Sequence, residues 1–208
     1  SQVGMVFQNP DNQIIGTSVE EDVAFGPENK NIEPEKIRKI VETVLRKVKL
    51  WDRRKASPSI LSGGQKQRLA TADALAGLPA CLVLDEPTAM LDPDSRKEVI
   101  NIVKELNRKE GMTIILITHH TDEVVDADRI VLMKDGKIIG DDIPKKIFAD
   151  YELLKKAKMD IPPVVELGMR LEKQQIGLEG PVLQEQEMIE KIVKLYRSKC
   201  GGKKDAAR

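Results

Sequence analysis

The chain has 208 residues, of which 40% are hydrophobic and 33% are charged, and its 34 basic residues balance 34 acidic ones. This balance gives no electrostatic preference for nucleic acid or for an anionic lipid surface, and the length suffices for a sizeable core. Two cysteines are too few for a disulfide framework and favour a reducing cytosolic setting, and no apolar run reaches the roughly 18–20 residues that cross a bilayer. If the protein serves a membrane, the composition predicts that it does so as a peripheral subunit.

Strand-like and helix-like patterns alternate through the first part of the chain. A buried strand is predicted at residues 3–7, followed by a polar loop at residues 8–12. From Ile37 to Val48 apolar residues recur at i, i+3, i+4 and i+7, which predicts an amphipathic helix with Pro34 in its first turn. The remaining elements expected here are a helix at residues 64–76, a strand at 80–84, a helix at 95–108, a strand at 112–117 and a hairpin at 129–139 with its turn at 135–136.

Beyond residue 142 the spacing becomes helical. Helices are predicted at residues 145–158, 164–173 and 186–197, with a linker at 177–181 and a disordered tail at 201–208. Because strands alternate with helices only before this point, we expect an α/β domain at residues 1–142 and a helical C-terminal extension at residues 143–208.

A five-residue string with two adjacent glycines precedes the helix predicted at residues 64–76. Glycines allow close backbone approach, and free amides at a helix N-terminus attract an anion. The plainer alternative for the serine is a helix N-cap with a flexible lead-in. The string consists of Leu61, Ser62, Gly63, Gly64 and Gln65.

The strand at residues 80–84 runs directly into two carboxylates, Asp85 and Glu86. In a parallel sheet this is the carboxyl edge, where ligands bind. The first carboxylate could hold Mg²⁺ through its water shell, and the next could polarise an attacking water. Two exposed acids at a strand end are the plainer alternative, but together with the glycine string they predict that a Mg²⁺-bound triphosphate is handled here.

Three further residues are candidates for the same site. His119 follows the strand at residues 112–117 and could contact a γ-phosphate and orient water, whereas an isolated His119–His120 pair is more often a surface feature. Gln8 ends the first strand and could coordinate Mg²⁺ or the water, or could be an ordinary loop residue. For Asp92 a role near the nucleotide and a helix-capping role are about equally supported.

This set of motifs resembles the nucleotide-binding subunit of ATP-binding cassette (ABC) transporters. In that family Gln8 matches the Q-loop, residues 61–65 the signature, residues 81–86 the Walker B segment, Asp92 the D-loop and His119 the switch histidine. The resemblance covers roughly residues 1–142 and implies a P-loop NTPase sheet with an α-helical subdomain at about residues 28–78. It also implies that two subunits sandwich two ATP molecules, with the signature of one covering the ATP of the other.

The roles of the site residues follow from that resemblance. Asp85 is then the Mg²⁺ ligand, Glu86 the catalytic base, His119 the γ-phosphate sensor and Gln8 the link to the membrane subunit. Contacts to ATP are expected from Gln8, Ser62, Gly63, Gly64, Gln65 and Asp92.

Residues 7–13 and 17–27 resemble the ATPases of energy-coupling-factor importers, including the cobalt-import type. This implies an ATPase at the cytoplasmic face of the cell membrane, with a second ABC ATPase, a transmembrane coupling subunit and a substrate-binding membrane subunit as partners. Cobalt, nickel and vitamins all remain open as cargo, as do an identical and a paralogous ATPase partner. A soluble, non-transport ABC ATPase is the alternative within the family, and no partner nucleic acid is expected.

The chain departs from the family pattern at its phosphate cradle. No G-x-x-x-x-G-K-[ST] string (Walker A) occurs in the sequence. We therefore expect a truncated or partial record of a larger ATPase, with weak or absent ATP binding by this chain alone and exposed apolar sheet surface that invites aggregation. A non-catalytic fragment is the corresponding functional alternative. Smaller departures are Met90, where the family usually has glycine, and Asp73, at a helix position that is usually small or basic.

Overall fold

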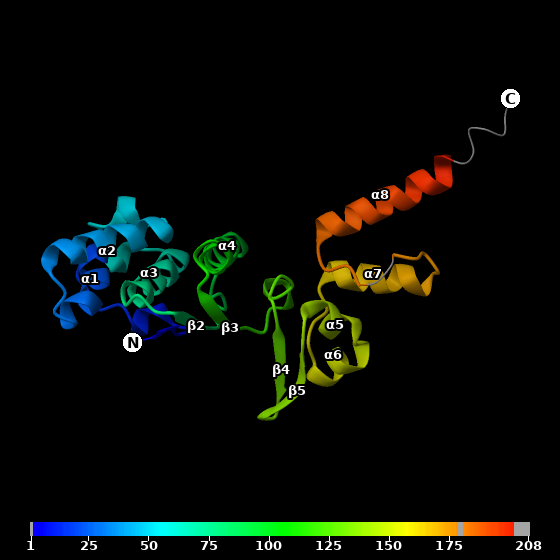
Figure 1. The fold of residues 1–208 in the computed structure, drawn as a ribbon, viewed down its shortest axis with the longest axis horizontal. Coiled ribbons are helices and arrows are strands. Elements are labelled where there is room, and N and C mark those ends of the chain that lie inside the picture. Colours follow the sequence, from blue (N-terminus) through cyan, green and yellow to red (C-terminus); the bar gives the residue numbers. More distant parts are fainter. Residues whose placement is uncertain (1, 179–180, 202–208) are drawn as a thin grey trace. The chain divides into compact units, whose positions relative to one another are not determined.

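The computed structural model describes residues 2–178 and 181–201, and it groups the chain into two compact units that divide between Thr118 and His119 (Figure 1). Throughout these described residues, every helix is too short or too polar to span a bilayer. The two units are described separately below.

The first unit is built on a parallel sheet of three strands in the order β1–β2–β3. The register pairs Val6 with Leu84 and Asp85 with Ile117, so the three strands end at the same edge of the sheet. The parallel α/β arrangement predicted from the sequence is confirmed, and the predicted strands are displaced by at most one residue. The strands are β1 (Val3–Val6), β2 (Cys81–Asp85) and β3 (Thr113–Ile117).

Three helices of the first unit gather into one bundle, and a fourth packs against the last of them (Figure 1). Buried side chains of these helices form one core with Val6, Leu82 and Leu84 of the sheet. The helices predicted near residues 34, 64 and 95 are confirmed. The four helices are α1 (Val19–Asn29), α2 (Pro34–Lys47), α3 (Gly63–Ala76) and α4 (Pro93–Glu110).

Helix α1 was not expected from the sequence. Its start carries a recognisable signal, because Ser18 caps the helix by accepting a hydrogen bond from the Glu21 amide at 3.4 Å, and Ser-x-x-Glu is typical of a helix N-terminus. Pro27 lies inside the last turn and masks the helical pattern. Helix α1 therefore forms from its Ser18 cap onward although it contains Pro27.

The other face of the sheet is apolar and open to solvent. Alternation along a strand sends successive side chains to opposite faces, so the residues flanking the buried ones point away from the helices. Five of these are between 41% and 51% exposed, which agrees with the exposed apolar sheet surface expected above. They are Val3, Met5, Phe7, Ile115 and Ile117.

The second unit begins with the predicted hairpin, whose strands β4 (Ile130–Lys134) and β5 (Lys137–Asp142) pair antiparallel. Asp135 and Gly136 form its turn with φ values of 49° and 72°, as a two-residue hairpin turn of the mirror-image type requires. Buried side chains of the hairpin pack with those of the helices that follow it, Phe148 among them.

The helices of the second unit differ in one respect from the prediction. The helix expected at residues 145–158 is two helices, because Asp150 leaves helical geometry and accepts a hydrogen bond from the Leu153 amide at 2.9 Å, which starts a new helix. The helices are α5 (Pro144–Ala149), α6 (Tyr151–Ala157), α7 (Pro163–Lys173) and α8 (Glu185–Gly201).

Part of the expected C-terminal organisation stays a prediction. Gly201 ends α8, whereas residues 202–208 of the predicted tail and residues 179–180 of the predicted linker lie outside the described residues. The compact units reflect contacts within the chain, so the domain boundary expected after residue 142 also stays a prediction.

Candidate functional site

The two carboxylates predicted at the sheet edge occupy different backbone conformations. Asp85 is the last residue of β2, and Glu86 follows it with φ at 45°, which is uncommon for a residue other than glycine. The amide of Glu86 donates to the carbonyl of Ile117 at 2.9 Å and so continues the ladder to β3 by one residue. The chain therefore turns out of the sheet at Glu86 while this residue is still tied to it.

Gln8 lies against Glu86. Its Nε2 donates a hydrogen bond to Oε2 of Glu86 at 3.0 Å, across 78 residues of sequence. Because β1 and β2 are parallel neighbours, the residues that follow their carboxyl ends meet at the sheet edge. The structure thus brings together two of the residues predicted for the site, with Asp85 adjacent in the chain.

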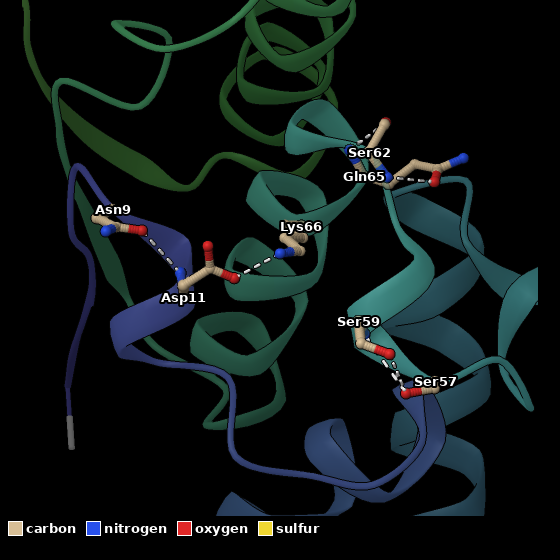
Figure 2. Close-up of polar contacts among 7 residues, drawn as sticks. All are labelled: Asn9, Asp11, Ser57, Ser59, Ser62, Gln65 and Lys66. Carbon is tan, nitrogen blue, oxygen red and sulfur yellow. Dashed lines mark hydrogen bonds and ion pairs between the residues drawn. The ribbon is translucent and has the colours of Figure 1, made fainter.

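The loop that begins at Gln8 is held to helix α3. Asn9 caps the short 3-10 turn Pro10–Asn12 by accepting from the Asp11 amide at 3.0 Å (Figure 2). Asp11 in turn pairs with Lys66 of α3 at 2.7 Å, as Figure 2 shows. Sequence reasoning did not identify the Asp11–Lys66 pair, because the two residues are far apart in the chain and no local pattern links them.

Ser62 and Gln65 form a capping box at the start of α3 (Figure 2). The Gln65 amide donates to the Ser62 hydroxyl oxygen at 3.3 Å, and the Ser62 amide donates to Oε1 of Gln65 at 3.0 Å. The N-cap alternative for Ser62 is therefore realised in this structure. The box leaves the first-turn amides of Gly63 and Gly64 outside its reciprocal bonds, and the exposed Ser62 hydroxyl can still donate its proton.

The two glycines of the string differ in their surroundings. A Cβ on Gly64 would lie 2.7 Å from both Cβ and Oγ of Ser95, so only glycine lets α3 approach α4 at this point. A Cβ on Gly63 would lie 3.5 Å from Leu91, which is an ordinary contact. Gly64 is thus required by helix packing, and Gly63 is the exposed glycine at the helix start.

Asp92 is the N-cap of α4. Its Oδ1 accepts from the amides of Asp94 at 3.1 Å and Ser95 at 3.0 Å. Hydrogen bonding from the Ser95 side chain, followed by the Ser95 amide, lowers the pKa of Asp92. These contacts confirm the helix-capping role of Asp92. Its contact with nucleotide stays a prediction.

His119 is an exposed residue two positions after the end of β3. Its ring centroid lies 4.1 Å from that of His120, with the two rings tilted by 39°. Since His119 opens the second unit, its predicted meeting with Asp85 and Glu86 stays a prediction.

A cavity of about 130 Å³ lies between the Gln8 loop, the first turns of α3 and the segment after Glu86. Gln8, Gly63 and Lys66 line it, together with Gln67, which is almost fully buried. The cavity shows that three strings separated in sequence border one space in the first unit. Gln67 is a lining residue that sequence reasoning missed, because nothing in its neighbourhood distinguishes it from a core helix position.

The donor set at the sheet edge fits Mg²⁺ bound together with phosphate. Asp85 supplies a carboxylate, and Gln8 supplies an amide oxygen, because its hydrogen bond to Glu86 uses the amide nitrogen. Among the described residues, no group of three or more His, Cys, Asp or Glu side chains could hold a metal by itself. Mg²⁺ at nucleotide sites is usually bound by one or two protein oxygens, with substrate phosphates and waters completing the shell, so the set is sufficient in kind.

Known proteins resemble this chain in both sequence and fold. Residues 1–89 match the ABC transporter family. The chain is 55% identical over 189 residues to the energy-coupling factor transporter ATP-binding protein EcfA1 of Caldanaerobacter subterraneus subsp. tengcongensis, covering 91% of this chain and 68% of the relative. The chain thus spans about two thirds of that relative's length.

Two solved structures share the fold. One is cbiO1 from Clostridium perfringens, described as part of the ABC transporter complex cbiONQ, with a TM-score of 0.69 and 37% identity over 82% of this chain and 67% of that one. The other is the dimeric ATP-binding cassette MJ0796 bound to ADP and Pi, with a TM-score of 0.60 and 30% identity over 69% of this chain and 63% of that one. The predicted ABC-type α/β fold is confirmed. The chain therefore belongs to the ABC transporter ATP-binding proteins, a family of ATPases, and within it to the ATP-binding subunits of energy-coupling factor transporters.

Proposed function

We propose that this chain works as the ATP-hydrolysing subunit that drives import of a metal ion or a vitamin through an energy-coupling factor transporter. The observation that carries the proposal is the Gln8–Glu86 hydrogen bond beside Asp85 at the carboxyl edge of the sheet. It sets the Q-loop glutamine against the carboxylate expected to act as general base and so fixes one oxygen of a group that must be oriented toward the water it deprotonates.

The residues at this edge of the sheet have different proposed roles in ATP hydrolysis. Asp85, with the amide oxygen of Gln8, would hold Mg²⁺, which supplies charge neutralisation for the phosphates. Glu86 accepts a proton from the attacking water, and its hydrogen bond from Gln8 orients the carboxylate. His119 is proposed to contact the γ-phosphate, on the strength of its place after β3 and of the family resemblance.

The signature string serves a second subunit. Ser62 and Gly63 are exposed at the start of α3, where a helix N-terminus favours a phosphate. Gln65 stabilises this first turn through the capping box with Ser62. Gly64 lets α3 pack closely against Ser95 of α4, and Asp92 caps the start of α4. We propose that this surface covers ATP held by a partner ATPase subunit, identical or paralogous.

Membrane association follows from the same proposal. The solved relative cbiO1 is part of a transporter complex, and we propose that this chain likewise binds a transmembrane coupling subunit from the cytoplasmic side, next to a substrate-binding membrane subunit. Cargo would be set by that membrane subunit. Uptake of labelled cobalt, nickel and individual vitamins by cells expressing the transporter identifies the cargo.

The decisive experiment uses the chain purified together with the subunits with which it assembles. Glu86→Gln should lower ATP hydrolysis by about 10²- to 10⁴-fold, the usual contribution of a general base, while bound ATP is retained. Glu152→Gln, an exposed carboxylate of α6, is the matched control and should leave hydrolysis unchanged. Equal rates for the wild type and Glu86→Gln would contradict the proposal and favour a non-catalytic role.

A further inference from the structure

Two aspartates face each other inside the first unit, away from the candidate site. Asp22 of α1 is 4% exposed, and Asp73 lies on α3, the helix with which α1 makes its most extensive contact. Asp73 as a residue is half-buried, but both of its carboxyl oxygens are shielded from solvent. Buried carboxyl groups need hydrogen-bond partners, and this requirement makes the pair informative.

One oxygen of Asp22 is fully engaged. Oδ1 accepts from the amide of Ile15 at 2.8 Å and from the amide of Gly16 at 2.6 Å. The segment at these residues packs tightly on α1, because a Cβ on Gly16 would lie 2.5 Å from the Asp22 amide nitrogen. The Asp22 carboxyl group is thus held in place by two backbone amides, and its second oxygen, Oδ2, remains available as an acceptor.

Three oxygens remain without a conventional donor. Within the part of the chain that the structure describes, no N–H or O–H of another residue reaches Oδ2 of Asp22 or either oxygen of Asp73. The two carboxyl groups are close enough to act on each other, because Asp22 is the side chain that contributes, with burial, to the raised pKa of Asp73. Burial, reinforced by the charge of Asp22, raises the pKa of Asp73 well above its usual range.

Among the described residues, no basic side chain forms an ion pair with Asp22 or Asp73. The basic side chains on α3 and directly after α1 have other partners: Lys66 of α3 pairs with Asp11, Arg68 of α3 with Glu98 of α4 and the carbonyl of Val48 after α2, and Lys30 after α1 with the carbonyl of Gly77. Of the acidic groups on α1, Glu21 bonds to Thr17 and Glu20 lies near Arg54. Among the described residues, Asp22 is the one charged group that acts electrostatically on Asp73.

We propose that Asp73 and Asp22 share a single proton, carried by Asp73 and donated to Oδ2 of Asp22, and that this pair is a proton-dependent clasp between α1 and α3. The clasp also holds the segment at Ile15 and Gly16, through which the chain passes from the Gln8 loop to α1. Together with the Asp11–Lys66 ion pair, it fastens the segment after Gln8 to the signature helix at a second point.

The sign of the pH dependence follows from the proton count. In the unfolded chain Asp73 loses its proton near its ordinary pKa of about 3.9, whereas in the folded chain it keeps it to higher pH. The folded state therefore binds one more proton in this window, so the stabilisation is complete below about pH 4 and is lost as pH rises through the folded pKa. Across the window this one proton changes the unfolding equilibrium constant by about tenfold per pH unit.

The test compares urea unfolding of the 208-residue chain and its variants from acidic to alkaline pH. Asp73→Asn replaces the protonated acid with an amide. The amide N–H can donate to Asp22 at every pH in the series because it does not titrate. The variant should match the wild type in free energy of unfolding at about pH 4 and exceed it at pH values above the folded pKa of Asp73. Its unfolding equilibrium constant should lack the change of about tenfold per pH unit. Asp52→Asn, at an exposed position, is the matched control and should follow the wild type.

A second readout is independent of stability. Infrared spectra of the folded wild type should show the C=O stretch of a protonated carboxylic acid that persists to higher pH than that of an ordinary aspartic acid, and Asp73→Asn should remove it. An unchanged pH dependence in Asp73→Asn overturns the proposal, and so does absence of the protonated-acid band from the folded wild type. If Asp73→Asn fails to fold, the wild-type band and its disappearance at lower pH in Asp22→Asn decide, because removing the charge of Asp22 lowers the pKa of Asp73 while its burial remains.

Discussion

Gln8 and Glu86 are joined by a hydrogen bond of 3.0 Å at the carboxyl edge of the sheet. The amide of Gln8 is the donor, so the carboxylate that we propose as general base is oriented by a residue of the neighbouring strand's loop. The backbone at Glu86, with φ at 45° and its amide tied to Ile117, limits the other positions that this side chain can reach. Orientation of Glu86 thus depends on two strands at once.

Replacing Gln8 tests this dependence. Gln8→Ala removes the donor, and because the bond lies at an exposed position we expect a loss of about 1 kcal/mol of transition-state stabilisation, or roughly fivefold in ATP turnover of the assembled transporter. Gln8→Glu should cost more, since it sets a second carboxylate against Glu86. Asn12→Ala in the same loop is the control, and equal turnover in all three variants would show that Gln8 does not orient Glu86.

Gly64 offers a test of the packing between α3 and α4. Gly64→Ala forces a Cβ within 2.7 Å of Ser95 and should destabilise the chain by about 1–3 kcal/mol, as overpacking of a core does. Gly63→Ala, where the new Cβ has room, should change the free energy of unfolding by less than about 0.5 kcal/mol. Urea unfolding measures both, and Ser95→Gly should restore part of the loss in Gly64→Ala. Equal effects at the two glycines would refute the steric explanation.

Asp92 should produce a pH dependence opposite in sign to that of Asp73. Hydrogen bonds from the Ser95 side chain and from the amides of Ser95 and Asp94 lower its pKa in the folded chain. Its stabilisation is therefore present above the unfolded pKa of about 3.9 and is lost as pH falls through the folded pKa. Asp92→Asn can still cap α4 but does not titrate, so urea unfolding should show less acid destabilisation than in the wild type. Identical acid profiles would argue against the cap as the cause.

The open face of the sheet predicts self-association of the isolated chain. Ile115 and Ile117 are 49% and 47% exposed on β3, and contiguous apolar surface of this kind drives association. Ile115→Thr combined with Ile117→Thr keeps two β-branched side chains and should lower the apparent mass in light scattering at high protein concentration. Val131→Thr on β4, also exposed, is the control. Unchanged scattering in the double variant would place the association elsewhere or exclude it.

Much of the site was predictable because its residues follow local patterns. Asp85 and Glu86 come directly after an apolar strand, and parallel strands deliver such residues to one edge. The capping box of Ser62 and Gln65 is likewise a local arrangement, set by a spacing of three residues. Helix α1 carries the same kind of signal at Ser18 and Glu21, but Pro27 interrupts its helical pattern, so the sequence does not predict it.

Local sequence patterns suffice to predict the α/β class, the strand ends that carry Asp85 and Glu86, and the resemblance to the ABC family, because periodicity and short motifs are properties of neighbouring residues. The tertiary structure alone decided that Gln8 meets Glu86, that Gly64 serves the contact with Ser95, and that Asp22 and Asp73 are buried together. Each of these pairs joins elements distant in the chain. Their contact depends on strand register and helix packing, which arise only when the whole unit closes around its core.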